Sequence, residues 1–342
     1  MDGDGGVLPG FIGVRDGDPE EGIDIVRRGN EWVLRARLAD AEFFYEQDLK
    51  ISLEDRLDDL KGVRFLRNAG TMYEKTLRLK QLTGDFASKL GLSADDAERA
   101  RQAANLSKCD LTTALVREFP ELEGIMGGLY AANEGFRADV AKALAQQYLP
   151  RGSKDPIPDG QAGSVLALSD KMDTLAVAFS LGVEVSGSQD PMGLRRAALG
   201  VVGILSGRGY DVDLDSLLEM PLELASKAVL EPAENAREKL SAFLVSRIET
   251  GLLEKGYSPG IVRAVLGGKE RRVPRIPFMA EALHSVSRTS ELEDVVIGWR
   301  RTSVLGKASS SRQVSPELLQ EEAEKDLYLI VTQQRERADE LF

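Results

Sequence analysis

The sequence predicts a mainly α-helical protein that begins with a short β or irregular segment. The first observation is that, from about residue 41, apolar residues recur at helix-like intervals, starting with Phe44, Leu49, Leu53, Leu57 and Leu60. The second is that the apolar stretch Val7–Val14 is broken by Pro9 and Gly10, which is typical of strand and turn.

The N-terminal region, residues 1–40, differs in pattern from the rest of the chain. Ile23–Val26 suggests another short strand, and helical spacing starts only at Glu31–Leu38. Because this region has too little apolar surface to bury a core of its own, we expect it to be the trailing edge of an upstream domain.

Several start signals divide the rest of the chain into helices. Ser93 and Asp96 resemble a capping box that opens an Ala-rich helix with a small face. Further helices are expected at Ala138–Tyr148, Val165–Leu181, which is apolar and buried, and Leu194–Leu205, and after Ser258–Pro259 and Ser315–Pro316. Ala308–Ser311 has the composition of a linker. We therefore expect a helical domain over 41–307, and a linker and helix over 308–342 that lead to a further C-terminal domain.

Composition excludes several classes of protein. His284 is the single histidine and Cys109 the single cysteine. This composition excludes a Ser-His-Asp triad that does not use His284, a zinc site made from several His and Cys residues, and an internal disulfide framework. No apolar run reaches transmembrane length, no signal peptide opens the chain, and no nucleotide-binding glycine motif occurs. These features fit a reducing cytoplasm, and we expect His284 at the core or its edge.

Charge gives a mixed indication. The net charge of −12, with 56 acidic against 44 basic residues, disfavours sequence-blind nucleic-acid binding. A local basic stripe can still bind RNA, however, and between residues 268 and 307 eight basic residues outnumber five acidic ones.

Two polar groups are candidates for a functional site. The first is a cluster within 108–118 that either packs as ordinary structure or lines a cleft wall; its members are Lys108, Asp110, Arg117 and Glu118. The second surrounds Lys171 on the predicted buried helix, where Asp170 and Asp173 are three residues apart and share a face. Two such carboxylates can pair internally with basic side chains or bind a cation.

Basic residues in three places are candidates for phosphate contact. Arg195 and Arg196 lie in the first turn of a helix, where the dipole disfavours them, so they need a partner: Asp170 and Asp173, or a phosphate. The other two places are the loop with Lys269, Arg271, Arg272 and Arg275, and the pair Arg300 and Arg301 after Trp299. These residues either form an ordinary solvated face or bind an RNA backbone beside an aromatic ring.

Four blocks of sequence resemble the bacterial glycyl-tRNA synthetase beta subunit. They are Asn30–Tyr45, Leu106–Ala131 with its Glu-Phe-Pro-Glu-Leu core, Ala167–Leu175, and Asp190 to Arg196. The blocks occur in the family's order, and the rest of the chain to about residue 330 matches more loosely.

The resemblance implies a fold and a set of partners. The family's beta subunit is longer than this chain and pairs with an alpha subunit as a heterotetramer. The alpha subunit carries the catalytic site for ATP, with magnesium, and for glycine, and the beta subunit supplies tRNA recognition. The middle of the beta subunit is a helical bundle related to the HD phosphohydrolases, followed by an anticodon-binding domain.

The chain departs from the family pattern in places. Gln146-Gln147 stands where the family commonly has Glu-His, Ser169 replaces Ala, and Glu123 replaces Gln. The region of Asp170 resembles the distal aspartate of HD domains, but the histidine partners that such a metal site needs are missing.

We therefore expect an HD-domain-like helical fragment of a beta subunit, without catalytic residues, metal or cofactor of its own, that positions tRNA-Gly for the alpha subunit. It should contact neither membrane nor DNA. Replacing Lys269, Arg271 and Arg272 together should then weaken tRNA affinity and flatten its salt dependence. The alternatives are a structural module that docks the alpha subunit without touching tRNA, and a metal-dependent phosphohydrolase that uses Asp170 and Asp173.

Overall fold

The computed structural model describes residues 10–17, 22–152, 154–185, 190, 192–268, 270–287, 289–306 and 314–339. Within these ranges the protein is mainly helical and forms no β-sheet, only isolated bridges between Arg64 and Thr71 and between Asp213 and Arg272. The prediction of a mainly α protein is confirmed. No helix in the described ranges is both long and apolar enough to cross a membrane.

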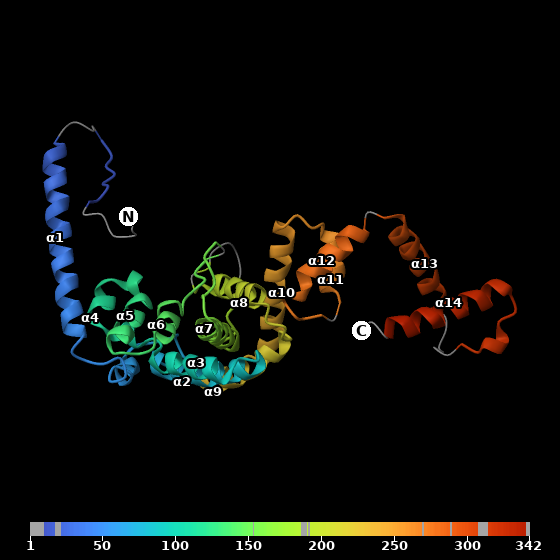
Figure 1. Cartoon of the computed structure of the whole chain (residues 1–342), viewed down its shortest axis with the longest axis horizontal. Helices are drawn as coiled ribbons and strands as arrows, with labels where there is room; N and C mark the ends of the chain where they lie inside the picture. The colour runs from blue at the N-terminus through green and yellow to red at the C-terminus, as the bar shows by residue number, and fades with distance from the viewer. Residues whose placement is uncertain are drawn as a thin grey trace. The chain divides into compact units, whose positions relative to one another are not determined.

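The chain forms two compact units, residues 1–280 and 281–342. The α-helices of the first unit are α1 (Ile23–Asp48), α2 (Met72–Lys89), α3 (Ala94–Leu106), α4 (Ala114–Glu118), α5 (Ile125–Asn133), α6 (Ala138–Ala145), α7 (Gln161–Ser180), α8 (Leu194–Arg208), α9 (Glu219–Ala228), α10 (Ala236–Glu254) and α11 (Pro259–Leu266) (Figure 1). Helix α12 (Arg275–Val286) crosses the boundary, and the second unit continues with α13 (Ser290–Gly306) and α14 (Glu322–Asp339). Short 3-10 turns connect them: η1 (Asp58–Gly62), η2 (Cys109–Thr112), η3 (Pro120–Leu122), η4 (Asp215–Leu218) and η5 (Pro316–Leu318). The division at residues 40 and 307 stays a prediction.

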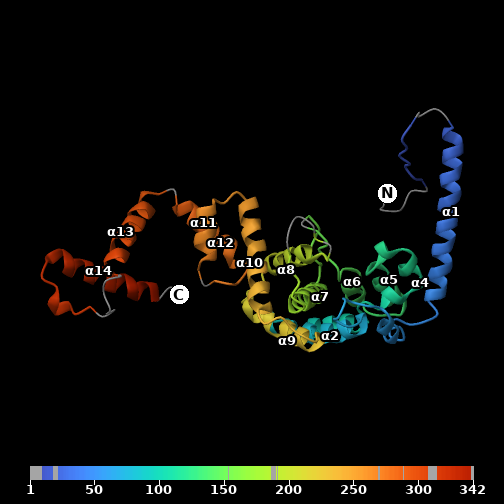
Figure 2. The same cartoon turned by 180° about the vertical axis from the view of Figure 1, so that it is seen from behind.

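Helix α7 is the centre of the first unit. It packs against α2, α3, α6, α8, α9 and α10, and the views in Figures 1 and 2 both show these helices around it. Its residues Ala162–Ser180 are buried, with Thr174 alone half-buried. A helix that is apolar on every side is stable only inside a core, so any charged residue on α7 must find its partner there.

N-capping side chains explain where the neighbouring helices begin. Thr71 and Glu74 form a complete capping box at the start of α2. Ser93 accepts the Asp96 N–H and Ser258 accepts the Ile261 N–H, so both predicted N-caps are confirmed. These caps fix the first turn of each helix by satisfying an amide that would otherwise have no partner.

Helices α5 and α6 approach each other at Gly128. A Cβ atom at this position would lie 2.6 Å from the Ala141 carbonyl oxygen and 2.7 Å from the Ala145 Cβ. Gly124, at the start of α5, has a φ of 79°. Gly124 therefore allows the turn into α5, and Gly128 allows the close approach of α6.

Three sequence expectations are wrong. Ile23–Val26 is the first turn of α1 and not a strand, because the single Gly29 before Glu31–Leu38 weakens a helix by only about 1 kcal/mol and does not end it. The leucines at 49–60 follow a helix-like spacing, but α1 ends at Asp48 and the chain continues in turns, with the Leu53 N–H donating to the Glu134 carboxylate.

The signal at Ser315–Pro316 begins only the 3-10 turn η5, and α14 starts six residues later, where the Glu324 carboxylate accepts the Gln320 and Glu321 N–H groups. Of the predicted N-terminal strand, residues 10–14 are irregular and Val7–Pro9 lie outside the described residues.

Candidate functional site

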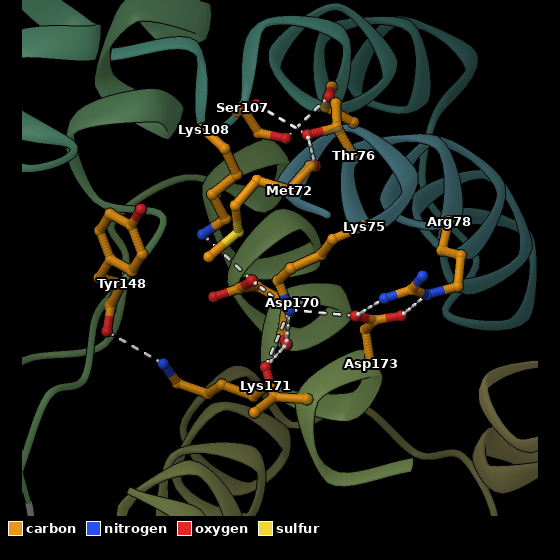
Figure 3. Close-up of polar contacts among 12 residues, drawn as sticks. Met72, Lys75, Thr76, Arg78, Ser107, Lys108, Tyr148, Asp170, Lys171 and Asp173 are labelled. Carbon is orange, nitrogen blue, oxygen red and sulfur yellow. Dashed lines mark hydrogen bonds and ion pairs between the residues drawn. The ribbon is translucent and has the colours of Figure 1, made fainter. Parts of the chain in front are cut away.

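A buried network of charged side chains connects α7 to α2 and to the turn after α3 (Figure 3). Helix α7 contributes Asp170, Lys171 and Asp173, which are 8%, 6% and 1% exposed. Helix α2 contributes Lys75 and Arg78, and the link between α3 and η2 contributes Lys108; these are 2%, 6% and 1% exposed. Ionic groups at this depth must satisfy one another, because water is excluded.

Asp173 is the more completely paired carboxylate. The Arg78 Nε donates to its Oδ1 at 2.6 Å and an Arg78 terminal nitrogen donates to its Oδ2 at 3.0 Å, which is a bidentate pair. The Lys75 Nζ lies 3.1 Å from the same Oδ2. Of the two roles that the sequence left open for these carboxylates, the structure places Asp173 in an internal salt bridge.

Asp170 receives two ammonium groups on one oxygen atom. Its Oδ1 lies 3.0 Å from the Lys75 Nζ and 3.1 Å from the Lys108 Nζ. Lys75 also donates to the Thr174 hydroxyl at 2.9 Å. Burial alone would raise the pKa of Asp170, but the two lysines outweigh burial and hold that pKa well below its usual range.

Lys108 sits under strain in this network. Its backbone φ of 71° is in the left-handed region, which is uncommon for a residue with a side chain. The Nζ lies 3.8 Å from the centre of the Tyr148 ring, a cation–π contact. Burial lowers the pKa of Lys108, and Asp170 partly opposes that shift.

Lys171 points toward the backbone of Tyr148 (Figure 3). Its Nζ donates to the Tyr148 carbonyl oxygen at 3.0 Å, and the absent side chain of Gly200 leaves room for its stem. Burial lowers the pKa of Lys171 to about 8, although Asp170 raises it.

Asp110 has a structural role at the start of α5. Its Oδ2 accepts the Gly124 N–H at 2.5 Å and the Gly127 N–H at 3.2 Å, so it caps the helix. Burial raises the pKa of this carboxyl, and the two amides and Lys108 oppose the shift.

A cavity of about 380 Å³ lies beside the network. Its polar lining residues are Lys75, Lys108, Asp170, Thr174, Tyr148 and Glu123, and its apolar lining residues are Val63, Phe65, Met72, Leu111, Val116 and Pro120. Burial raises the pKa of Glu123, while Lys108 lowers it. The cavity therefore combines ammonium and carboxyl groups with apolar walls.

The chemistry that this arrangement offers is limited. Among the described residues, no three His, Cys, Asp or Glu side chains come together as a metal site. Cys109 is next to the network, but burial raises the pKa of its thiol to about 12, so the reactive thiolate is suppressed. The buried charges link α7 to α2 and to the turn after α3 by ion pairs.

The structure brings together some of the sequence-predicted cluster and not the rest. Lys108, Asp110, Asp170, Lys171 and Asp173 share the region of the network and its cavity. Arg117 and Glu118 are exposed on α4, where Glu118 lies 3.7 Å from Arg37 of α1.

The predicted basic residues have mixed surroundings. Asp190 accepts the backbone N–H groups of Arg195 and Arg196 at 3.1 and 3.2 Å, and its Oδ2 lies 3.5 Å from the Arg196 Nε. The ion-pair partner of Arg196 is therefore Asp190, and neither Asp170 nor Asp173.

The arginines of the loop before α12 contact acidic side chains. Glu270 accepts the N–H groups of Arg271 and Arg272, and its other carboxylate oxygen lies 3.9 Å from the Arg272 guanidinium. Arg275 forms a bidentate pair with Asp211 at 2.7 Å. Lys269 lies outside the described residues.

In the second unit, Arg300 and Arg301 are exposed on α13, next to Trp299, which is 67% exposed. His284 is half-buried in the last turn of α12.

The sequence analysis did not identify Lys75 and Arg78 as site residues, although both carry ion pairs of the network. The available signal was their position on the inner stripe of α2, which continues through Leu79, Leu82 and Phe86. Cations placed on an otherwise apolar stripe indicate buried carboxylates in the neighbouring helix.

The fold and the site define a helical module in which the buried carboxylates of α7 are paired with basic side chains of α2 and of the link after α3. The chain belongs to a family of tRNA synthetase subunits: its residues 1–267 match the family described as glycyl-tRNA synthetase beta subunit.

Curated relatives agree with this assignment. The chain is 39% identical over 339 residues to the glycine–tRNA ligase beta subunit of Desulforudis audaxviator, covering 99% of this chain and 49% of the relative. For the protein of that name from Clostridioides difficile the identity is 39% over 338 residues, with 99% and 49% covered. For that from Halothermothrix orenii it is 40% over 333 residues, with 96% and 48% covered. The chain thus spans about half the length of the curated relatives it matches.

Proposed function

We propose that this chain is the part of a glycine–tRNA ligase beta subunit that binds tRNA-Gly and positions it for ATP-dependent glycylation by an alpha subunit. The observation that carries the proposal is the family match over residues 1–267. The internal pairing of Asp170 and Asp173 supports a binding role, because the buried carboxylates are already neutralised by Lys75, Arg78 and Lys108.

In this proposal the chain accelerates the reaction by orientation and contributes no reacting group. ATP and magnesium are used by the alpha subunit, this chain holds no cofactor, and the protein acts in the cytoplasm. The helical bundle around α7 is a relic of the HD fold. Elemental analysis of the purified chain tests the last point: stoichiometric divalent metal that is lost in Asp170→Asn would support the phosphohydrolase alternative instead.

The main test is a salt titration of tRNA binding by the full chain. Labelled tRNA-Gly is titrated with protein at several salt concentrations, and fluorescence anisotropy gives the dissociation constant at each. A chain that neutralises phosphates gives a log–log slope of several units against salt. Binding that is unmeasurable at low salt would contradict the proposal, and a non-cognate tRNA shows whether the chain discriminates.

A second candidate function, docking of the alpha subunit, is favoured by α1. Along this helix large apolar side chains are exposed, including Trp32 at 72%, Leu38 at 69% and Phe43 at 55%. Exposed apolar residues grouped on one element are typical of a protein interface.

Co-elution with purified alpha subunit tests docking. Trp32→Arg with Leu38→Arg should abolish co-elution, whereas the polar control Glu42→Gln on the same helix should not change it. Docking that survives the double substitution would remove α1 from the interface.

A further inference from the structure

A surface hollow of about 500 Å³ lies where the chain enters α2, apart from the buried network. It is lined by Lys61, Gly62, Arg64, Leu66, Arg67, Asn68, Gly70 and Thr71. Three of these side chains are cationic, and none of these lining residues is acidic. In a chain with a net charge of −12, such a local excess of positive charge needs an explanation.

The loop around the hollow has a fixed backbone. The Met72 N–H donates to the Val63 carbonyl at 2.7 Å, and the Phe65 N–H donates to the Gly70 carbonyl at 3.1 Å. Asn68 and Gly70 take left-handed φ values of 66° and 77°. The loop therefore folds back on itself as a tight turn held by main-chain hydrogen bonds.

Alternation along this loop separates an inner from an outer side. Val63 and Phe65 line the cavity beside the network, and the Phe65 ring lies 4.3 Å from the Lys75 Nζ. Arg64, between them, lines the hollow together with Arg67, and both are exposed. In extended backbone neighbouring side chains point to opposite faces, so the inward position of Phe65 fixes the outward direction of Arg64.

The two arginines differ from the basic residues that the sequence singled out near α8 and α12. Within the described residues, neither Arg64 nor Arg67 forms an ion pair, whereas Arg196 and Arg275 are paired with Asp190 and Asp211. Lys61 is engaged locally with Asp58 at 2.8 Å. A guanidinium group without a carboxylate partner remains available for the bidentate hydrogen bonds that phosphate oxygens accept.

We propose that this hollow is a phosphate-contact site for the tRNA backbone, with Arg64 and Arg67 as the contacting residues and Lys61 adding charge at its rim. The inference rests on the proposed function and assigns its phosphate contacts to a place that the sequence had not indicated. Because contacts to phosphate carry no base information, the site orients tRNA without discriminating among sequences.

The test compares two double variants of the full chain in the anisotropy titration. Arg64→Ala/Arg67→Ala should weaken binding about tenfold or more at 100 mM salt and reduce the salt slope by about two, one for each phosphate contact. The matched control, Arg101→Ala/Arg137→Ala, removes the same charge from exposed arginines that pair locally with Glu98 and Asp139, and should change binding less than about twofold. Arg64→Lys/Arg67→Lys should recover most of the salt slope but only part of the affinity, since charge remains and bidentate geometry is lost.

The outcomes separate the two proposals. If the unchanged chain binds tRNA and the Arg64/Arg67 variant behaves like the control, the hollow is not a contact site and the proposed function stands. If the unchanged chain does not bind at low salt, both proposals are overturned. Circular dichroism and urea midpoints equal to those of the unchanged chain show that weaker binding does not come from unfolding.

Discussion

Asp173→Asn tests whether the buried network holds the first unit together. The substitution keeps the shape of the side chain but removes the charge that accepts the bidentate pair from Arg78 and one contact from Lys75. Arg78 would then be a buried cation without a carboxylate, since its ion-pair partner within the described residues is Asp173. Breaking a buried pair in this way costs about 3–5 kcal/mol.

The assay is urea unfolding of the full chain, followed by circular dichroism at the helix band. With a denaturant slope of about 3 kcal/mol per molar, the loss corresponds to a midpoint lowered by about 1–1.7 M. The control is Glu223→Gln on α9, where the carboxylate pairs with Lys227 and both side chains are more than 60% exposed. An exposed pair of this kind contributes no more than about 1 kcal/mol.

Replacing both partners distinguishes a lost charge balance from general disruption. Arg78→Met/Asp173→Leu leaves no unpaired guanidinium, and Lys75 keeps Asp170 and Thr174. We expect this double variant to be more stable than Asp173→Asn alone, because a buried pair exchanged for apolar side chains of similar volume is often neutral. If the midpoint of Asp173→Asn equals that of the control, the network does not stabilise the fold and the reasoning fails.

Three further predictions concern the surroundings of the network. Because burial lowers the pKa of Lys171 to about 8, its positive charge opposes folding below pH 8, and this penalty is relieved as the pH rises toward the unfolded pKa of 10.5. Relative to Lys171→Met, the unchanged chain should therefore gain about 2 kcal/mol of stability between pH 7.5 and 9.5. Equal pH profiles of the two chains would contradict the pKa shift. Gly200→Ala places a Cβ 2.7 Å from the Lys171 Cδ and should lower the free energy of unfolding by about 1–3 kcal/mol in the same urea assay. The control is Gly203→Ala on the same helix, whose Cβ would have no neighbour within 4 Å and which should be neutral or stabilising. Thr71→Ala removes the capping box of α2 and should cost about 1 kcal/mol, measured as faster amide exchange in the first turn of α2; unchanged exchange there would show that the cap is dispensable.

The sequence predicts well those features that depend on interactions between residues close together in the chain. Helical spacing and N-caps depend on residues a few positions apart, and the structure confirms the N-caps at Ser93 and Ser258. The same spacing misleads around Leu53 and Leu57, because four-residue intervals between leucines fit a helix and a series of turns equally well when turns also bury them.

What the sequence leaves open depends on contacts between distant residues. Asp173 and Arg78 are 95 positions apart, so the face shared by Asp170 and Asp173 indicated a need for cations but not which ones. Arg275 likewise pairs with Asp211 across 64 positions, and no local pattern distinguishes it from Arg64, which forms no ion pair with any residue that the structure describes. The pairing of each cation, which decides whether it can contact a phosphate, is a property of the fold.

Helix α1 is fixed to the rest of its unit near one end. Its residues from Ile23 to Asp40 are exposed, whereas Asp48 is buried and accepts the N–H groups of Ala114 and Leu115 and the Tyr130 hydroxyl. A helix of 26 residues is about 39 Å long. A rotation of about 10° at Asp48 therefore displaces Ile23 by roughly 7 Å over that length. The mechanical consequence is that α1 projects from its unit like a cantilever: a ligand bound at its exposed end acts on α4 and α5 with a long moment arm, through Asp48 and through the contact of Arg37 with Glu118.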